Sequence, residues 1–464
     1  MRILIQSRRF VLLSIYLMMP GHRISAQQPP TNPAPDERFK ADILVIAPHP
    51  DDESTIAGYL AKAVLDEHRR VVVVVTTRGD AGQNLVGYEQ ARTLGEIREI
   101  ETRQALASIG IDKVFFLRMP DTPGSDIEDV LRSLETADHG NAIGQAVRFI
   151  RLTRPDVVIT MLPATVVGEN HEDHQASSVI ATEAFDLAGD PTAFPEQVAA
   201  PEDRLWYGNL MEGLRPWQPK KLYYYTDATH FEFLKGKGPE YSMTAISPSQ
   251  RVSYARLAAT ELSFHRTQYG DEPAKALATN NLRDFEQPLP FLLAKSVIGG
   301  TVTGDIMDGV RSGAIAFAPV RGYRPETSPA LSIELGEGWA FYRRFYPAHN
   351  LEVMPGLLAP ERGVGSGQHL PVYVLLHNAT DKAVTFHLRT QLPPGWSVDS
   401  TSAQHSHPWP MTEFVASPHD DFPVRVRLVA PRLAKSEWQT IIWTATADGQ
   451  ELGPVALRIY VYGR

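Results

Sequence analysis

The chain has 464 residues, 43% of them hydrophobic and 21% charged, which is ordinary for a globular protein of roughly two or three domains. Asp and Glu outnumber Lys and Arg by 54 to 45, and this acidic balance argues against nucleic-acid binding. The absence of cysteine excludes disulfides, cysteine-held zinc or iron–sulfur sites and a catalytic thiol. Any bound metal must therefore be held by His, Asp or Glu.

Residues 1–26 have the pattern of a secretory signal peptide. Arg8 and Arg9 precede an apolar stretch at Phe10–Met19, which is shorter than the about 20 apolar residues of a membrane span. Ala26 supplies the small residue expected before a cleavage point. The segment predicts a secreted or periplasmic protein, exported by the general or the twin-arginine route, with no membrane span in the mature chain. An uncleaved membrane anchor is the alternative.

A proline-rich, polar stretch at residues 27–39 is typical of a linker. After it, β-branched runs at 42–47 and 70–77 predict strands buried on both faces, with a helix between them over 54–67. Further helices are expected at 88–109 and around 144–152, and further strands at 113–117, 156–161 and 221–226. Strands that alternate with helices predict an open, mostly parallel, Rossmann-like α/β sheet with flanking helices over residues 40–315.

The sequence pattern changes after a Gly- and Pro-containing connection expected at residues 316–340. Short alternating segments then follow, for example at 370–377, 384–390, 423–429, 440–445 and 455–461. They are separated by Asn, Asp, Gly and Pro and show no helical periodicity. Residues 341–464 are therefore predicted to form an all-β sandwich of immunoglobulin-like type.

Polar side chains follow the first predicted strand directly, in the segment PHPDDE at 48–53. In open α/β sheets, ligands bind beyond the carboxyl ends of the strands. His49 and Asp52, three residues apart on a proline-stiffened turn, can converge on one cation, with Asp51 pointing elsewhere. The alternative is a turn in which Asp51 or Asp52 only caps the following helix.

A second cluster, NHEDH at 170–174, lies beyond the strand predicted at 156–161 and opens a helix that runs to about Leu187. His171 and His174 are one helical turn apart and lie on a similar face. Alone, this cluster would be a solvated helix start. Two such clusters on the same rim of one sheet predict a His/His/Asp metal site. Three protein ligands with an open position are typical of catalytic zinc, and the same donors suit ferrous iron.

These residues resemble the PIG-L/LmbE-like zinc N-deacetylase family. The PHPDDE and HEDH segments carry the resemblance, together with segments at 77–82, 98–110, 119–121, 219–223 and 263–268, so that it covers about residues 40–300. In the sandwich, the segment PPGW at 393–396 resembles a signature of Ig-like domains attached to galactosidases. The resemblance implies a Zn²⁺-dependent hydrolase acting on linear amide bonds.

The resemblance also implies the ligands of the metal and the general base. His49 and Asp52 match the first two zinc ligands of the family, and His174 matches the third. Asp51 matches the carboxylate that takes the proton of the zinc-bound water. Neutral-pH amide hydrolysis fits these roles, because zinc lowers the pKa of bound water to about 7.

The remaining residue roles also come from the resemblance. His171 matches a histidine that, as an imidazolium, stabilises the tetrahedral oxyanion, and Asp173 matches the carboxylate that orients it. Arg98 and Asp121 fall where the family has residues that face the sugar.

Three functions remain open on the sequence. The first is a secreted N-deacetylase of an N-acetylglucosamine-type sugar or glycoconjugate. The second is a hydrolase of another small-molecule amide, and the third is a surface protein that binds carbohydrate through the sandwich and has a vestigial metal site. Intact Asp51 and His171 argue against the third. The sandwich would either tether the protein to wall glycans or a partner, or pack on the rim of the α/β sheet.

Overall fold

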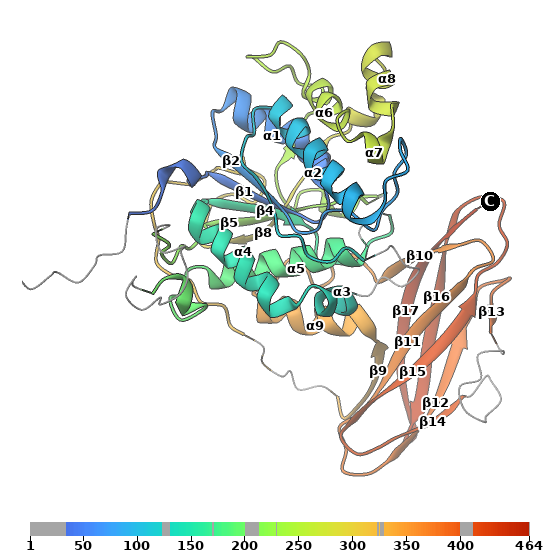
Figure 1. Cartoon of the computed structure of the whole chain (residues 1–464). Coiled ribbons are helices and arrows are strands. Elements are labelled where there is room, and N and C mark those ends of the chain that lie inside the picture. Colours follow the sequence, from blue (N-terminus) through green and yellow to red (C-terminus); the bar gives the residue numbers. More distant parts are fainter. Residues whose placement is uncertain are drawn as a thin grey trace, which may run out of the picture.

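The computed structural model describes residues 34–122, 130–168, 171–199, 213–228, 230–322, 324, 329–399 and 412–463. The predicted signal peptide at 1–26 and most of the linker predicted at 27–39 lie outside these residues. Figure 1 shows an α/β domain built on one central sheet and a β-sandwich beside it. In the parts of the chain that the structure describes, we find no helix with the length and apolarity of a membrane span.

The central sheet has six strands in the order β3-β2-β1-β4-β5-β8. These are β1 (Ile43–Ala47), β2 (Val71–Val75), β3 (Val114–Phe116), β4 (Val157–Met161), β5 (Lys221–Tyr225) and β8 (Leu292–Ser296). The strands β1 to β5 are parallel, and β8 runs antiparallel to β5. β1 and β2 are buried along their whole length, which explains their continuous apolar runs.

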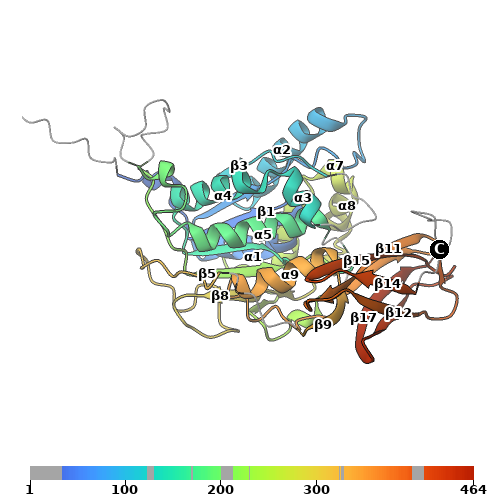
Figure 2. The ribbon, with the colours of Figure 1, turned by 90° about the horizontal axis from the view of Figure 1, so that it is seen from below.

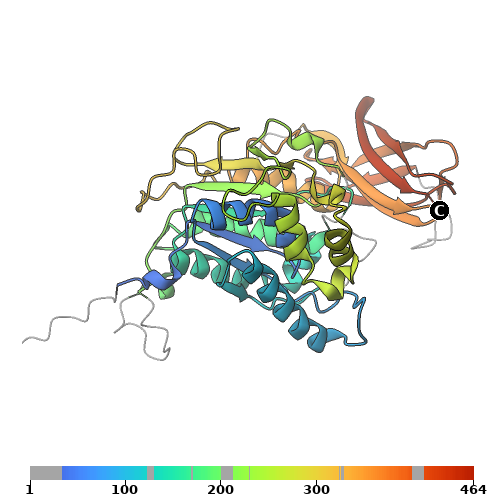
Figure 3. The same ribbon diagram turned by 90° about the horizontal axis from the view of Figure 1, so that it is seen from above.

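Helices cover both faces of this sheet. One face, in front in Figure 2, carries α3 (Val130–Thr136), α4 (His139–Thr153), α5 (Glu172–Leu187) and α9 (Glu337–Ala348). The other face, in front in Figure 3, carries α1 (Ala57–Ala61), α2 (Ala91–Ser108) and α6 (Tyr254–Leu262). Leu44 and Ile46 of β1 point to the first face and Ile43 and Val45 to the second. The predicted Rossmann-like α/β fold is confirmed.

Short elements complete this domain. They are η1 (Glu37–Phe39), η2 (Asp52–Ile56), η3 (Lys62–Asp66), η4 (Pro195–Gln197), η7 (Glu232–Leu234), β6 (Glu240–Tyr241), α7 (Arg266–Tyr269), α8 (Glu272–Thr279), η8 (Arg283–Phe285) and β7 (Leu289–Pro290). The elements η2, α1 and η3 follow one another without a break, so the helix expected over 54–67 begins two residues earlier, at Asp52. Because of this start, Asp52 lies close to the carboxyl end of β1.

The order of the strands determines where a ligand can bind. β1 and β4 are neighbours, and the chain continues from β1 towards β2 and β3 but from β4 towards β5. Connections that leave in opposite directions open a crevice beyond the carboxyl ends of the two strands. The PHPDDE segment follows β1 and the HEDH segment opens α5 after β4, so both lie at this crevice.

Two sheets form the C-terminal sandwich. One contains β9 (Leu331–Leu335), β11 (His369–Asn378), β13 (Ser397–Val398) and β15 (Asp420–Val429). The other contains β10 (Glu361–Gly365), β12 (Val384–Gln391), β14 (Glu413–Ala416), β16 (Glu437–Ala447) and β17 (Gln450–Tyr462). Alternate residues of these strands face each other in a closed apolar core around Trp443. The predicted all-β sandwich is therefore present.

The boundary between the domains differs from the prediction of a connection at 316–340 and a sandwich from 341. β9 lies within the predicted connection but pairs with β11 as a strand of the sandwich. α9 then packs on the α/β domain, where Tyr342 and Phe345 are buried in the core. The apolar stripe of α9 explains this return, because it can be buried only against the helices of the sheet. The chain thus crosses between the domains more than once.

The sandwich contacts the α/β domain close to the crevice. Glu361, the first residue of β10, is buried and accepts a hydrogen bond from the backbone N–H of Val167 at 3.1 Å. The same carboxylate lies 2.6 Å from Nε2 of His230. Val167 belongs to the loop between β4 and α5, which leads to His171. The sandwich therefore supports the loop that carries the second histidine cluster.

Candidate active site

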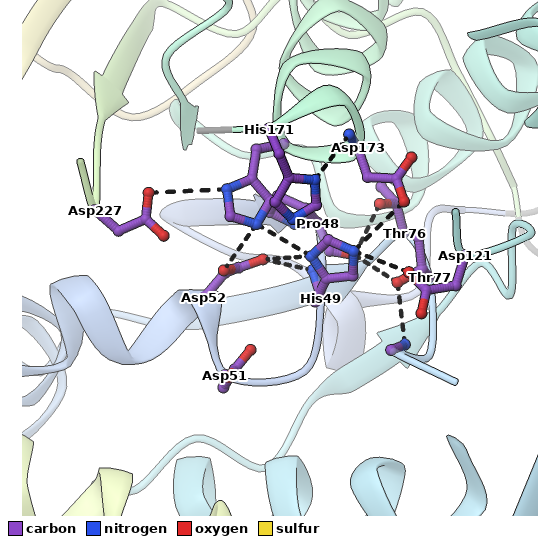
Figure 4. Close-up of polar contacts among 12 residues, drawn as sticks. Pro48, His49, Asp51, Asp52, Thr76, Thr77, Asp121, His171, Asp173 and Asp227 are labelled. Carbon is purple, nitrogen blue, oxygen red and sulfur yellow. Dashed lines mark hydrogen bonds and ion pairs between the residues drawn. The ribbon is translucent and has the colours of Figure 1, made fainter. Parts of the chain in front are cut away.

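Three side chains from the two predicted loops converge at the carboxyl end of β1 (Figure 4). Nε2 of His174 lies 3.2 Å from Nδ1 of His49 and 3.3 Å from Oδ1 of Asp52. Nδ1 of His49 lies 3.1 Å from Oδ2 of Asp52. All three residues are buried. The structure therefore brings together the three residues that the sequence predicted as metal ligands.

The geometry of these atoms fits a divalent cation. Metal–ligand bonds of about 2.0–2.2 Å at tetrahedral angles place the ligand atoms roughly 3.3–3.5 Å apart, close to the separations found here. Asp51, Asp52, Asp121 and Asp227 surround the position, so the site is rich in negative charge. A bound cation would also accept the lone pair of Nε2 of His174, because the nitrogen of a neutral imidazole is a good metal ligand.

Further carboxylates orient the two ligand imidazoles. Nε2 of His49, opposite the atom that faces His174, lies 3.0 Å from Oδ1 of Asp121 and 3.6 Å from Oδ2 of Asp173. Nδ1 of His174 lies 3.8 Å from Oδ1 of Asp227. Such carboxylate–imidazole contacts set the tautomer of a metal-ligating histidine and raise its basicity. Our sequence analysis missed Asp227, although it follows β5 on the same rim of the sheet.

The pKa shifts of the ligands reflect the same charges. Burial opposes protonation of His49, but its contacts with Asp121, Asp173 and Asp52 outweigh burial and raise the pKa of His49 well above its ordinary value. The pKa of Asp52 is lowered, because the neighbouring His174 and His49 outweigh its burial. The pKa of His174 is lowered well below its ordinary value, chiefly by burial. A neutral His174 and an ionised Asp52 are the forms that bind metal, and binding through Nδ1 of His49 requires that a metal displace the proton from that ring.

Asp51 occupies an unusual backbone conformation beside this site. Its φ is 123°, a value that L-residues rarely adopt, and its N–H donates to Oε2 of Glu53 at 3.0 Å. Burial and the neighbouring Asp52 raise the pKa of Asp51 well above its ordinary value. Asp51 lines the same cavity as the candidate ligands without belonging to their closest group. This arrangement suits a carboxylate that accepts a proton instead of holding a metal.

Behind Asp51 lies a buried cluster of two carboxylates and one imidazole. Nε2 of His265 is 3.3 Å from Oε1 of Glu53 and 3.7 Å from Oε1 of Glu261, and all three side chains are fully buried. Because Glu53 also receives the N–H of Asp51, the cluster supports the strained turn. The sequence analysis noted the motif around His265 but did not predict its contact with Glu53.

The structure places His171 next to the candidate ligands. Its ring centroid lies 4.1 Å from that of His174. Burial and the neighbouring His49 lower the pKa of His171 to about 4, so that the ring is neutral at pH 7. Its Nδ1 accepts a hydrogen bond from the backbone N–H of Asp173 at 3.4 Å. A neutral ring can accept this bond, whereas an imidazolium could not.

The carboxylate of Asp173 does not orient His171 as the sequence analysis expected. It accepts hydrogen bonds from the backbone N–H of Thr122, at 2.8 Å, and from the hydroxyl of Ser133, and it also faces His49. These contacts tie the start of α5 to the loop after β3 and to α3. It is the backbone of Asp173, at the start of the helix, that positions His171.

Arg98 and Asp121, the two residues expected to face a sugar, both bond to other groups of the protein. The guanidinium of Arg98 is buried and donates to the carbonyls of Gly79 and Gln83, which shapes the loop after β2. Asp121 accepts the N–H of Ala81 at 2.6 Å with one oxygen and faces His49 with the other. Both line the cavity, but their polar atoms chiefly support its wall.

The site opens into a cavity of about 430 Å³. Ala81 and Gly82 after β2, Thr122 after β3, and Gln268 and Tyr269 of α7 complete its wall. Several loops on one rim thus combine to form a polar pocket of the size that binds a small molecule.

Comparisons with known proteins find a family of de-N-acetylases and related deacetylases. A model of the family described as PIG-L: GlcNAc-PI de-N-acetylase matches residues 44–185. A 1D-myo-inositol 2-acetamido-2-deoxy-alpha-D-glucopyranoside deacetylase 1 of Catenulispora acidiphila is 29% identical over 187 residues, which are 38% of this chain and 56% of that protein. A deacetylase of the same description from Nocardioides sp. is 28% identical over 292 residues, which are 56% of this chain and 94% of that protein.

Solved structures of low identity are also similar. The conserved protein TT1542 from Thermus thermophilus is 23% identical, with a TM-score of 0.37, over 56% of this chain and 97% of that one. The N,N'-diacetylchitobiose deacetylase from Pyrococcus horikoshii is 19% identical, with a TM-score of 0.39, over 54% of this chain and 83% of that one. Residues 44–185 of this chain thus match the PIG-L family, and this stretch contains both histidine loops of the candidate site.

Proposed function

We propose that this chain is an exported, metal-dependent N-deacetylase of an N-acetylglucosamine-type sugar or glycoconjugate. The observation that carries the proposal is the convergence of His49, Asp52 and His174, at 3.1 to 3.3 Å, in a cavity that Asp51 and His171 also line. A site that only bound a metal or a ligand would need neither the separate carboxylate of Asp51 nor the third imidazole, His171.

His49 through Nδ1, Asp52 through its carboxylate and His174 through Nε2 would hold the ion. When bound, the ion supplies Lewis acidity, which brings the pKa of a coordinated water to about 7. The Asp51 carboxylate accepts a proton from the attacking water as the water oxygen bonds to the acetyl carbon. Asp51 then donates this proton to the sugar nitrogen as the C–N bond breaks, which yields acetate and a free amine.

His171 would stabilise the negative charge on the former carbonyl oxygen. The N–H of Asp173 occupies Nδ1 of His171, so the neutral ring carries its hydrogen on Nε2. This Nε2–H is available to donate to the oxyanion, and such a contact strengthens as charge develops in the transition state. The backbone of α5 thereby selects the tautomer that the reaction needs.

The substrate class rests on the relatives. The matched proteins of Catenulispora acidiphila and Nocardioides sp. are described as deacetylases of a 2-acetamido-2-deoxyglucopyranoside. The chain spans only 56% of the first of these proteins, so their substrate is carried over as a class and not as a compound. Zinc is the metal that we propose, with ferrous iron as the second candidate. Export through residues 1–26 and glycan contact through the sandwich belong to the same proposal.

The test is acetate release from N-acetylglucosamine, N,N'-diacetylchitobiose and longer chitooligosaccharides by the mature chain. We expect release that a chelator abolishes and that zinc restores. Acetate release that a chelator leaves unchanged would contradict the metal-dependent mechanism. Full metal occupancy without acetate release from any of these sugars, but with hydrolysis of other small amides, would favour the second function left open by the sequence.

A further inference from the structure

A second cavity adjoins the candidate active site. It has a volume of about 320 Å³ and shares two lining residues, Asp227 and Tyr269, with the cavity around the metal ligands. Asp227 lies 3.8 Å from the ligand His174. Ser54 and Thr55, which also line the second cavity, follow the ligand Asp52 on η2. The two cavities therefore adjoin at Asp227 and Tyr269.

The two cavities differ in chemistry. Histidine and aspartate side chains dominate the wall of the first, whereas Phe231, Met243, Leu262, Phe285 and Leu289 dominate the wall of the second. Apolar walls of this kind gain free energy when an apolar group replaces the water against them. A sugar ring, with its many hydroxyl groups, would leave most of these walls without a suitable partner.

The apolar wall is preformed. Met243 and Leu289 are buried and belong to the core between the sheet and helix α6, so the floor of the cavity is fixed by packing. Phe231, Leu262 and Phe285 are only half-buried and leave part of their surface open to the cavity. A fixed floor with open aromatic sides is typical of a pocket that receives a ligand with little rearrangement.

The charges near this cavity restrict the ligand further. Asp227 stands where the two cavities meet, and Asp284 also lines the second one. These carboxylates disfavour an anionic group such as a phosphate, while a neutral apolar group avoids the repulsion. Asp227 would be close to the polar end of a substrate, where the sugar begins.

We propose that the cavity lined by Phe231, Met243 and Phe285 is a subsite for a neutral apolar substituent of the amino-sugar substrate. This inference rests on the proposed deacetylase function and specifies its substrate class. The substituent is either an aglycone on the sugar or a long acyl chain on its nitrogen. Both are aliphatic or aromatic groups attached to a polar ring, and both meet the requirements of the two cavities.

The experiment is a series of substrates with growing apolar groups. Methyl, butyl and octyl glycosides of N-acetylglucosamine test the aglycone, and the methyl glycosides of N-butanoyl- and N-octanoylglucosamine test the acyl chain. We expect kcat/KM to rise at least about tenfold in one of the two arms, either from the methyl to the butyl glycoside or from the N-acetyl to the N-butanoyl sugar, because one methylene in an apolar pocket contributes roughly tenfold or more. The arm that shows the rise identifies the source of the apolar group.

A matched pair of variants links this gain to the cavity. Phe231 and Phe233 lie on the same short turn, both are half-buried and both pack against the same core, but only Phe231 is among the lining residues of the second cavity. Phe231→Ala should reduce the butyl-to-methyl ratio of kcat/KM several-fold. Phe233→Ala should leave this ratio unchanged, which controls for general loss of packing.

Calorimetric titration with the same glycosides measures their affinity for the subsite and does not depend on turnover. Affinity that increases with chain length in the wild type, and less steeply in Phe231→Ala, would support the subsite even if none of the sugars were hydrolysed. Deacetylation of the methyl glycoside, with rates and affinities that are independent of chain length in both arms, would overturn the subsite while the proposed function stands. Absence of hydrolysis of every sugar, measured as acetate from the N-acetyl glycosides and as butanoate or octanoate from the other two sugars, would count against the proposed function alone.

Discussion

Nε2 of His49 lies 3.0 Å from the carboxylate of Asp121, on the side of the ring opposite the atom that faces His174. Asp121 thus holds a candidate metal ligand, although the sequence suggested that it faces a substrate. Ligands that are oriented in this way are common at metal sites, and removing the orienting group weakens metal binding. The contact leads to the first prediction.

Asp121→Asn should weaken metal binding about 10- to 100-fold, because the amide cannot stabilise the His49 ring as a carboxylate does. Competition with a chelator of known affinity measures the change. Asp112→Asn, at an exposed position, is the control and should bind metal as the wild type does. Equal affinities in the two variants would show that the Asp121 contact has no role in the metal site.

Asp51→Asn should keep the metal and lose about 10²- to 10⁴-fold in kcat, because an amide cannot accept the proton of the attacking water. Elemental analysis and steady-state kinetics measure the two quantities on the same preparation. His174→Ala serves as the matched comparison and should lose the metal itself. Turnover near the wild-type level in Asp51→Asn would remove Asp51 from the role of base.

His265→Gln should lower the free energy of unfolding by about 3–5 kcal/mol, because it leaves the buried carboxylates of Glu53 and Glu261 without their cationic partner. Urea unfolding measures this change. His387→Gln, at a half-exposed position on the sandwich, should cost much less. If the two variants were equally stable, the buried cluster would not carry the ion pairs that its geometry indicates.

The stabilisation by His265 should depend on pH in a defined direction. Burial opposes its protonation, but Glu261 and Glu53 outweigh burial and hold the pKa of His265 well above its ordinary value. A pKa raised on folding contributes stability that is complete below the unfolded value of about 6.5 and is lost as the pH rises through the folded value. The difference in stability between wild type and His265→Gln should therefore shrink towards alkaline pH.

Glu361→Ala should weaken the contact between the sandwich and the loop before α5. The substitution removes the carboxylate that accepts from the backbone N–H of Val167 and faces the ring of His230, which costs about 1–3 kcal/mol when these groups stay buried. We expect the variant to unfold in two separated calorimetric transitions. Glu413→Ala, on an exposed edge of the sandwich, is the control, and identical thermograms would argue against domain coupling through Glu361.

The position of α9 affects how the sandwich can be removed. Tyr342 donates a hydrogen bond to Gln175 of α5 at 2.9 Å, and Tyr346 donates to the carbonyl of Pro163 at 2.8 Å. A truncation at residue 340, where the sequence suggested the domain begins, would remove these contacts from the α/β domain. If such a truncation lost activity, the loss would come from the missing contacts of α9 with the α/β domain and would not show a role of the sandwich.

Local patterns in the sequence were sufficient for the elements of the sheet and for a His/Asp cluster at its rim, whereas the choice of three candidate metal ligands came from the family resemblance. Valine-rich runs such as Val71–Val75 indicate buried strands because no other surroundings accommodate them. The cluster could be predicted because the PHPDDE segment follows β1 directly and the HEDH segment opens the helix after β4, and parallel strands end at one rim. Periodicity and spacing act over a few residues, and these features depend on nothing longer.

Only the tertiary structure determined which side chains contact the candidate ligands and the residues beside them. Asp227 meets His174 from β5, and Glu53 meets His265 from a distant part of the chain, contacts that no local spacing encodes. The neutral state of His171 likewise follows from its burial and from the N–H that reaches its Nδ1. Orientation, tautomer and charge are determined by neighbours in space, and the packing of the whole domain selects those neighbours.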